Sequence, residues 1–213
     1  AATDAQVKRN AARDLAKKLK LERAFIVRLR SYYSEMRQTI RVRLSASGIA
    51  PPASDFQDEL AANLKWQYRR VAKEFTGLLI EDLDKNFQYE AKDAQLDAVL
   101  AEIEKYLAGR ADRNAAFITQ TTQKEIDAAI AAVFAAAVAN NENLSNEEAA
   151  RRVQRKLAVT QSYRPNFLAE NETADVAEAV KEVEFLTLAE AGVLIGGAAL
   201  LASTVKQWDS VLL

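Results

Sequence analysis

Proline and glycine are scarce in this chain, and this scarcity limits the folds that are open to it. The 213 residues include only three Pro and six Gly, whereas Ala, Leu, Glu, Lys, Arg and Gln recur throughout. Proline breaks helix interiors and glycine weakens them, while the recurrent residues are the strongest helix formers. We therefore predict an all-α fold, an elongated multi-helix bundle with long helices.

The first helix is predicted from about residue 4 to residue 45, because Gly48 and Pro51-Pro52 follow. Apolar residues recur along it at alternating spacings of four and three, which is typical of one narrow apolar seam. The seam contains Leu15, Leu19, Ile26, Leu29, Tyr33, Met36 and Ile40, interrupted by Glu22. Packing into a bundle is the favoured interpretation, with a coiled-coil dimer as the alternative.

Ser54 and Gly109 predict where the next helices begin and end. Ser54 and Gln57 are spaced as a capping box that would open a second helix. A third helix is expected over about 92–107, with Gly109 as its left-handed C-cap, and a fourth over 111–139. The expected apolar faces are Phe56, Leu60, Leu64, Val71, Phe75 and Leu79 on the second helix, and Phe117, Ile126, Ile130, Val133, Phe134 and Val138 on the fourth.

A second and clearer capping box is formed by Ser145 and Glu148. It predicts a short helix over 147–157 whose Val153 and Leu157 face inward. These boundaries suggest three segments. They are a basic N-terminal helical arm over 1–50, a helical body over 51–140, and a C-terminal helical region over 141–213.

Charge is distributed unevenly. Residues 1–44 contain twelve Lys and Arg against four Asp and Glu, a net charge of +8, so the remainder carries −9 of the total of −1. A basic arm on an acidic body suggests docking to nucleic acid or to an acidic protein surface. Solvated helix faces are the alternative. The candidate partner-binding residues are Arg9, Arg13, Lys17 and Lys20.

The chain contains no Cys and no His. Disulfide frameworks, zinc fingers, thiolate nucleophiles and histidine relays are therefore excluded. A carboxylate site could be imagined at Glu170, Glu172, Asp175 and Glu178. A surface run lacks the converging oxygens of a metal site or the opposed environments of a catalytic pair, so we interpret it as solvated helix surface. We expect no enzyme activity, no metal and no cofactor.

Two further segments allow alternatives. Trp66 and Tyr68 lie among Lys65, Arg69 and Arg70, which could form a stacking surface for single-stranded nucleic acid, but core aromatics are favoured. The apolar segment Phe185–Val205 is nearly long enough to span a bilayer and contains a Gly-x-x-x-Gly pattern. Since Glu190 lies inside it, a buried helix is favoured over membrane insertion.

Two motifs in the C-terminal region carry a resemblance to a known family. The first runs from Arg164 through Leu168-Ala169 to Glu172-Thr173-Ala174, and the second is Lys206-Gln207-Trp208-Asp209-Ser210. Together with the short helix ahead of them, they resemble the signature of phage minor head proteins of the Mu-F-like head morphogenesis family. Asn171 stands where that family usually has threonine, and the family's following aspartate–arginine–histidine motif is missing. We expect a signature region truncated before that motif.

The resemblance implies a structural virion protein of a tailed phage or prophage. Such a protein would lie in the capsid interior near the portal vertex, after assembly in the host cytoplasm. It would act in head morphogenesis and in DNA packaging or delivery, in several copies, with the portal and other head proteins and possibly packaged DNA as partners. The alternative is an ejected internal protein that contacts DNA or the host inner membrane.

The resemblance also implies structural roles for Arg164, Glu172, Thr173 and Trp208. Arg164 and Glu172 are expected to be structural partners if they meet. We expect the ring of Trp208 to pack against the helix over 164–183 and so to tie the C-terminal segment to the rest of the protein.

Overall fold

The computed structural model describes the backbone of residues 4–87 and 93–190, and the side chains of residues 8–78, 101 and 103–182. This part of the chain contains a short 3-10 helix, η1, and no β-strand. The all-α prediction is therefore confirmed. The elements are α1 (Asp4–Ser47), η1 (Ala53–Phe56), α2 (Gln57–Phe87), α3 (Asp93–Ala139), α4 (Asn146–Thr160) and α5 (Arg164–Glu190).

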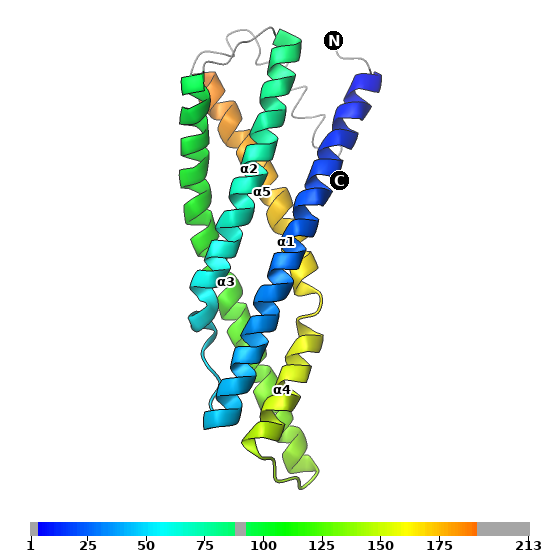
Figure 1. Cartoon of the computed structure of the whole chain (residues 1–213), viewed down its shortest axis with the longest axis vertical. Coiled ribbons are helices and arrows are strands. Elements are labelled where there is room, and N and C mark those ends of the chain that lie inside the picture. Colours follow the sequence, from blue (N-terminus) through cyan, green and yellow to red (C-terminus); the bar gives the residue numbers. More distant parts are fainter. Residues whose placement is uncertain (1–3, 88–92, 191–213) are drawn as a thin grey trace.

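The helices form an elongated bundle (Figure 1). α1, α2 and α3 run along its length in alternating directions, and α4 and α5 follow one another as a fourth column. α4 packs against α1 and α3, whereas α5 packs against α1, α2 and α3. The helix that carries the first family-like motif is thus in contact with all three long helices.

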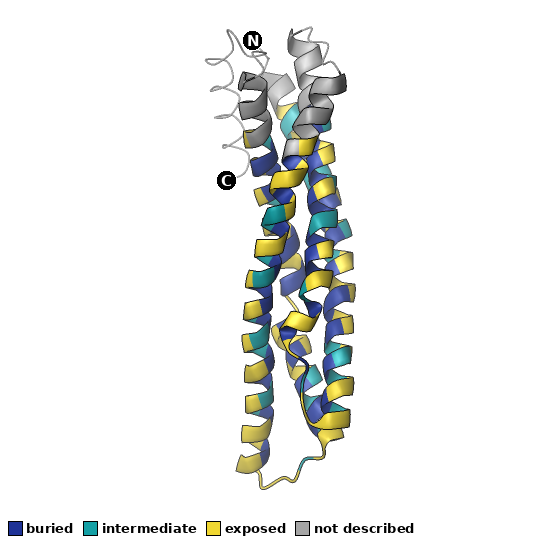
Figure 2. Cartoon of the chain, turned by 90° about the vertical axis from the view of Figure 1, so that its left-hand side faces the viewer, coloured by how far each residue is buried: buried dark blue, intermediate teal, exposed yellow. Residues whose placement is uncertain are grey.

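One continuous hydrophobic core runs along the bundle. Buried positions face inward on every helix and exposed positions face outward (Figure 2). The core draws on residues of the segments 1–50, 51–140 and 141–213 alike. Its largest fully buried side chains are Tyr33, Tyr68, Phe25, Leu29, Met36, Ile40, Leu44, Leu60, Leu64, Leu78, Ile103 and Ile126.

The predicted seam of α1 is correct in its second half and wrong near its start. From Leu29 to Ile40 the predicted residues are buried, but Leu15 and Leu19 are 51% and 42% exposed. Leu21 and Phe25 are buried in this part of the helix. A straight helix drifts relative to a repeat of 3.5 residues, so the buried stripe winds around α1 and does not follow one fixed face.

The predicted capping box at Ser54 is wrong. Ser54 lies inside η1, whose N-cap is Pro52, and the backbone N–H of Gln57 donates to the backbone carbonyl of Ser54 and not to its hydroxyl. The backbone N–H of Ala53 donates to the side-chain oxygen of Gln123 at 2.7 Å. A side chain of α3 therefore holds the start of η1, and a backbone bond leads from η1 into α2.

The predicted apolar face of α2 is confirmed from Phe56 to Phe75, and the side chain of Leu79 lies outside the described residues. The two aromatic residues of the basic segment differ in environment. Tyr68 is 1% exposed and belongs to the core, whereas Trp66 is only half-buried and packs against the edge of the core. The interpretation as core aromatics therefore holds fully for Tyr68.

The predicted break at Gly109 is wrong, because α3 continues through it without interruption. One glycine costs a helix interior only about 1 kcal/mol, which packing on both sides outweighs. The predicted apolar face of this region is partly wrong as well. Ile126 and Val133 are buried, but Phe117, Phe134 and Val138 are exposed.

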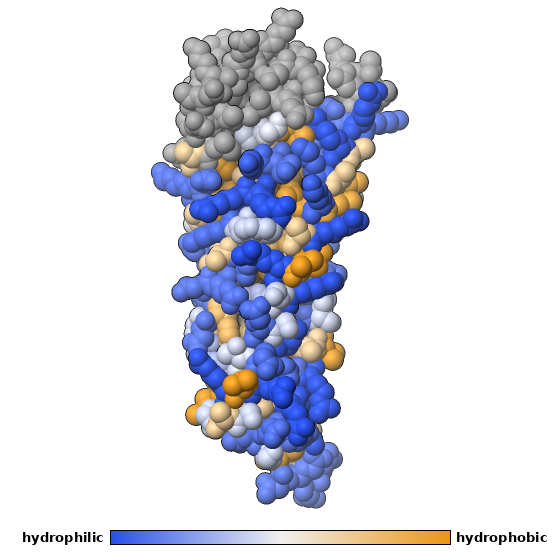
Figure 3. Space-filling model, in the orientation of Figure 1, coloured by the Kyte–Doolittle hydropathy of each residue, from blue (hydrophilic) through white to orange (hydrophobic). Residues whose placement is uncertain are grey.

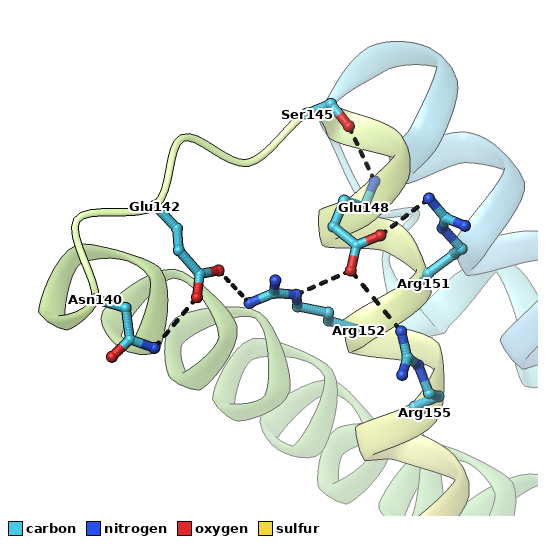
Figure 4. A network of polar contacts seen from close by, with 7 residues as sticks. All are labelled: Asn140, Glu142, Ser145, Glu148, Arg151, Arg152 and Arg155. Carbon is cyan, nitrogen blue, oxygen red and sulfur yellow. Dashed lines mark hydrogen bonds and ion pairs between the residues drawn. The ribbon is translucent and has the colours of Figure 1, made fainter.

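The turn between α3 and α4 agrees with the sequence. α3 ends at Ala139, and Asn141 has a φ of 52°, a left-handed conformation that Asn tolerates. The Ser145 hydroxyl accepts a hydrogen bond from the backbone N–H of Glu148 at 3.2 Å (Figure 4). The Glu148 carboxylate pairs with Arg151 and Arg152, each at 3.0 Å, and not with the backbone N–H of Ser145, so only the serine half of the predicted capping box is confirmed. Val153 and Leu157 are buried as predicted.

A substitution of Gly109 tests the continuity of α3, and a substitution of Gly48, which follows α1, is its contrast. A Cβ at Gly109 would approach only the flexible Arg113 side chain, at 3.5 Å. We expect Gly109→Ala to raise the free energy of unfolding by about 0.5–1 kcal/mol, as measured by urea denaturation. Gly48→Ala is the contrasting variant, since Gly48 has a φ of +73°. It should lower stability by about 1–2 kcal/mol. Destabilisation by Gly109→Ala would contradict a continuous helix.

Candidate functional site

The family-like residues Arg164, Glu172 and Thr173 lie inside the bundle. All three are buried, at 6%, 8% and 0% exposure. They lie on α5, where Pro165 in the first turn fits a position that needs no N–H donor. Because buried polar groups are costly unless they are hydrogen-bonded, the partners of these three residues define the candidate site.

Arg164 connects α5 to α3. One terminal guanidinium nitrogen lies 2.7 Å from a carboxylate oxygen of Glu125, and the other donates to the Thr122 hydroxyl at 3.0 Å. The Gln161 side chain donates to the second carboxylate oxygen of Glu125 at 3.1 Å. The phenol of Tyr33 on α1 is buried beside this cluster. Burial raises the pKa of Tyr33, and the neighbouring charge of Arg164 opposes that rise.

Glu172 connects α5 to α2 and α3. Its carboxylate accepts a hydrogen bond from the Tyr68 hydroxyl, and the Asn114 amide donates to both of its oxygens, at 3.2 Å and 2.9 Å. The same amide lies 3.0 Å from the Tyr68 oxygen. Burial and the adjacent Glu172 charge raise the pKa of Tyr68 far above its ordinary value. The Tyr68 phenol therefore stays protonated at neutral pH and can donate to the carboxylate.

Thr173 extends the network to α1 through Gln67. The Gln67 amide donates to the Thr173 hydroxyl at 2.8 Å and to the backbone carbonyl of Leu21 at 3.4 Å. Together, Arg164, Glu172 and Thr173 bond α5 directly to α2 and α3, and through the Gln67 side chain to α1. Arg164 and Glu172 have separate partners, so the two residues do not meet.

Five partners of these residues were not identified from the sequence: Gln67, Tyr68, Asn114, Thr122 and Glu125. A signal for two of them exists. Gln67 stands between Leu64 and Val71, and Thr122 between Ile118 and Ile126, at the spacing of core residues. A polar residue in such a place predicts a buried hydrogen bond.

The interpretation of the acidic run as solvated surface is wrong for Glu172 and correct for its neighbours. Glu170, Asp175 and Glu178 are exposed, and Asp175 pairs with Arg110 at 2.8 Å. The four carboxylates therefore do not converge. Among the residues with described side chains, no cluster of three or more Asp or Glu is arranged to hold a metal ion.

Glu22 is a second buried carboxylate and lies at the point where the α1 seam was interrupted. It is 8% exposed and lies 3.7 Å from the Lys18 ammonium. Burial raises the pKa of Glu22, Lys18 opposes the rise, and the Glu170 charge across the helix interface adds to it.

The four candidate docking residues of the basic arm have different environments. Arg13 lies 3.3 Å from Asp14, and Lys17 pairs with Glu74 of α2 at 3.2 Å. Arg9 and Lys20 are exposed. The four residues follow one another at spacings of four, four and three and so share one side of α1, where two of them are already paired. Their role in docking stays a prediction.

Two further predictions fall on residues that the structure does not describe. Trp208 lies outside the described residues, as does most of Phe185–Val205, of which only the backbone as far as Glu190 is described, within α5. In the described part of the chain, no helix meets the length and hydropathy required to cross a bilayer.

Comparisons of the chain with protein-family models, with curated proteins and with solved structures found no match.

The buried ion pair of Arg164 should matter more than an exposed one. Arg164→Ala leaves the Glu125 carboxylate without its guanidinium, and breaking a buried pair typically costs about 3–5 kcal/mol. The control is Arg43→Ala, which removes the exposed pair with Asp55 and should cost at most about 1 kcal/mol. Urea unfolding of both variants checks the difference. Equal effects would show that Arg164 does not hold α5 to α3.

The raised pKa of Glu22 predicts a pH-dependent stability. Between its ordinary pKa and its higher folded-state pKa, the folded chain binds more protons than the unfolded chain, so this residue's contribution to stability falls as pH rises. Glu22→Gln removes that contribution. Its urea midpoint should exceed that of the wild type at pH 7, and the difference should shrink toward pH 4. A difference independent of pH would contradict a raised pKa.

Proposed function

We propose that the protein is a structural component of a tailed-phage or prophage particle, a minor head protein associated with the portal. The observation that carries this proposal is the burial of Arg164, Glu172 and Thr173 with partners on the other helices. In the family that the sequence resembles, the corresponding stretch is the defining signature. Here that stretch organises the bundle, which suits a protein acting through its shape.

The mechanism would be adhesion and steric organisation without turnover. A long bundle with a continuous core is a stiff spacer, and several copies could surround the portal ring on the capsid interior. Glu172, the one family-like residue able to act as a base, is enclosed by Tyr68 and Asn114. Those contacts favour a structural carboxylate over a catalytic one.

A second candidate function is that of an internal protein delivered with the DNA. The concentration of positive charge in residues 1–44 favours it. In this case the chain would contact packaged DNA and leave the particle at ejection. The host inner membrane as a partner rests only on the apolar sequence Phe185–Val205.

Imaging of intact particles by cryo-electron microscopy tests the proposal. We expect mass spectrometry to detect the chain in purified heads, and the reconstruction to place its bundle inside the capsid beside the portal ring. Arg164→Ala should lower incorporation through loss of folding, whereas Arg43→Ala should be incorporated normally. Absence of the chain from purified particles would overturn the proposal, and its loss from emptied particles would favour the second candidate.

A further inference from the structure

Two arginine side chains share one tryptophan ring on the outer face of α1 and α2. The guanidinium carbon of Arg28 lies 4.8 Å from the ring centroid of Trp66, and that of Arg70 lies 4.6 Å from it. Both distances are within the range of cation–π attraction. Two positively charged guanidinium groups, one from α1 and one from α2, therefore contact the same ring.

A hydrogen bond to a buried amide also orients the Arg28 side chain. Its Nε donates to the side-chain oxygen of Asn63, which is 5% exposed. This bond uses one of the five guanidinium N–H donors and leaves the terminal ones available. Arg28 is thus oriented by a buried amide and a ring, and its binding of an anion would cost little side-chain entropy.

A third cation continues the group along α2. Lys73 is exposed and follows Trp66 by seven residues and Arg70 by three, so the three residues share one side of the helix. Among the described side chains, none of Arg28, Arg70 and Lys73 makes an ion pair within 4.0 Å. Two acidic residues bear on this group: the charge of Glu59 interacts with Arg28, and Glu74, next to Lys73 in sequence, is paired with Lys17.

The surroundings favour nucleic acid over a protein partner. The face of the bundle drawn in Figure 3 is mostly hydrophilic, with small and separated apolar areas. Over residues 57–78 of α2, no large apolar side chain is exposed, and on α1 the exposed apolar residue next to Arg28 in sequence is the single Val27. Protein interfaces have an apolar centre, whereas interfaces with DNA are more polar and strongly positive. A stacking site for bases does not fit, because the two guanidinium groups occupy the Trp66 ring.

We propose that Arg28, Arg70 and Lys73 form a contact site for the phosphate backbone of double-stranded DNA. The planar guanidinium presents paired N–H donors that match phosphate oxygens, and Lys73 adds a point charge. The site recognises no base sequence. This inference rests on the proposed role in DNA packaging or delivery, in which such a site would contact the packaged DNA. Its location on α1 and α2 differs from the four residues that the charge pattern singled out.

Fluorescence anisotropy of the full chain with a labelled 20-base-pair duplex tests the site. The test variant is Arg70→Gln/Lys73→Gln. The control is Lys124→Gln/Lys156→Gln, which removes the same charge from exposed positions on α3 and α4. Neither variant breaks an ion pair, and the test variant loses only the contact of Arg70 with the Trp66 ring, about 0.5–1 kcal/mol, so both should stay folded at the assay temperature, as checked by circular dichroism.

Loss of two phosphate contacts should weaken binding by roughly ten- to a hundredfold at 0.1 M salt and lower the slope of log affinity against log salt by about 1.8. The control should stay within about twofold of the wild type, since it removes no phosphate contact. Absence of wild-type binding at 50 mM salt, an equal loss in the control, or an unchanged test variant would overturn the proposal. Displacement of the duplex by an oligo-glutamate peptide of equal total charge would also overturn it, in favour of an acidic protein partner.

The DNA-binding site and the proposed function can be refuted independently of each other. Binding in solution examines the site alone, whereas particle imaging examines the location of the chain. A chain that binds DNA and is absent from particles would refute the role and keep the site.

Discussion

The bundle depends on the pairing of charged groups in its interior. Arg164 and Glu172 are almost fully buried, and an unpaired charge in such a place would cost several kcal/mol. Each therefore requires its partners to lie at fixed positions: Glu125 and Thr122 for the guanidinium, Tyr68 and Asn114 for the carboxylate. Apolar attraction is non-directional, whereas these hydrogen bonds and the ion pair need particular partners, so we infer that they contribute to the register of α5.

The turn between α4 and α5 lies beside one of these charged groups. Gln161 is the C-cap residue of α4, and its side-chain amide donates a hydrogen bond to the Glu125 carboxylate. α5 then begins at Arg164, which reaches the same carboxylate. The turn thus places two donors around one acceptor of α3. Glu125 serves as the common anchor of both helices, which allows α5 to take its own path between α1, α2 and α3.

The general architecture could be predicted because it depends on local preferences. The scarcity of helix breakers predicted the fold class, and the capping serine predicted the start of α4 to within one residue. Errors arose where a local signal was overruled by packing, as at Gly109 inside α3 and at Leu15 on the outside of α1. A single glycine or leucine contributes too little free energy to decide either position.

The candidate site could be predicted only in part. The residues on α5 were identified through a sequence resemblance, but the acidic run around Glu172 was interpreted as surface because a run of carboxylates gives no sign of which member is buried. Its partners are more than fifty residues distant in sequence, at separations of 104 and 58 residues for Tyr68 and Asn114. Pairing over such distances depends on the relative height of the helices, which helical periodicity does not determine.

A double-mutant cycle between Tyr68 and Glu172 tests the central claim most directly, that the family-like residues act by joining helices. Urea unfolding of Tyr68→Phe, Glu172→Gln and the combined variant yields the coupling free energy. Contacting groups of this kind couple by about 0.5–3 kcal/mol, and we predict a value in that range, favourable to the native pair. Additive effects, with a coupling near zero, would contradict the account.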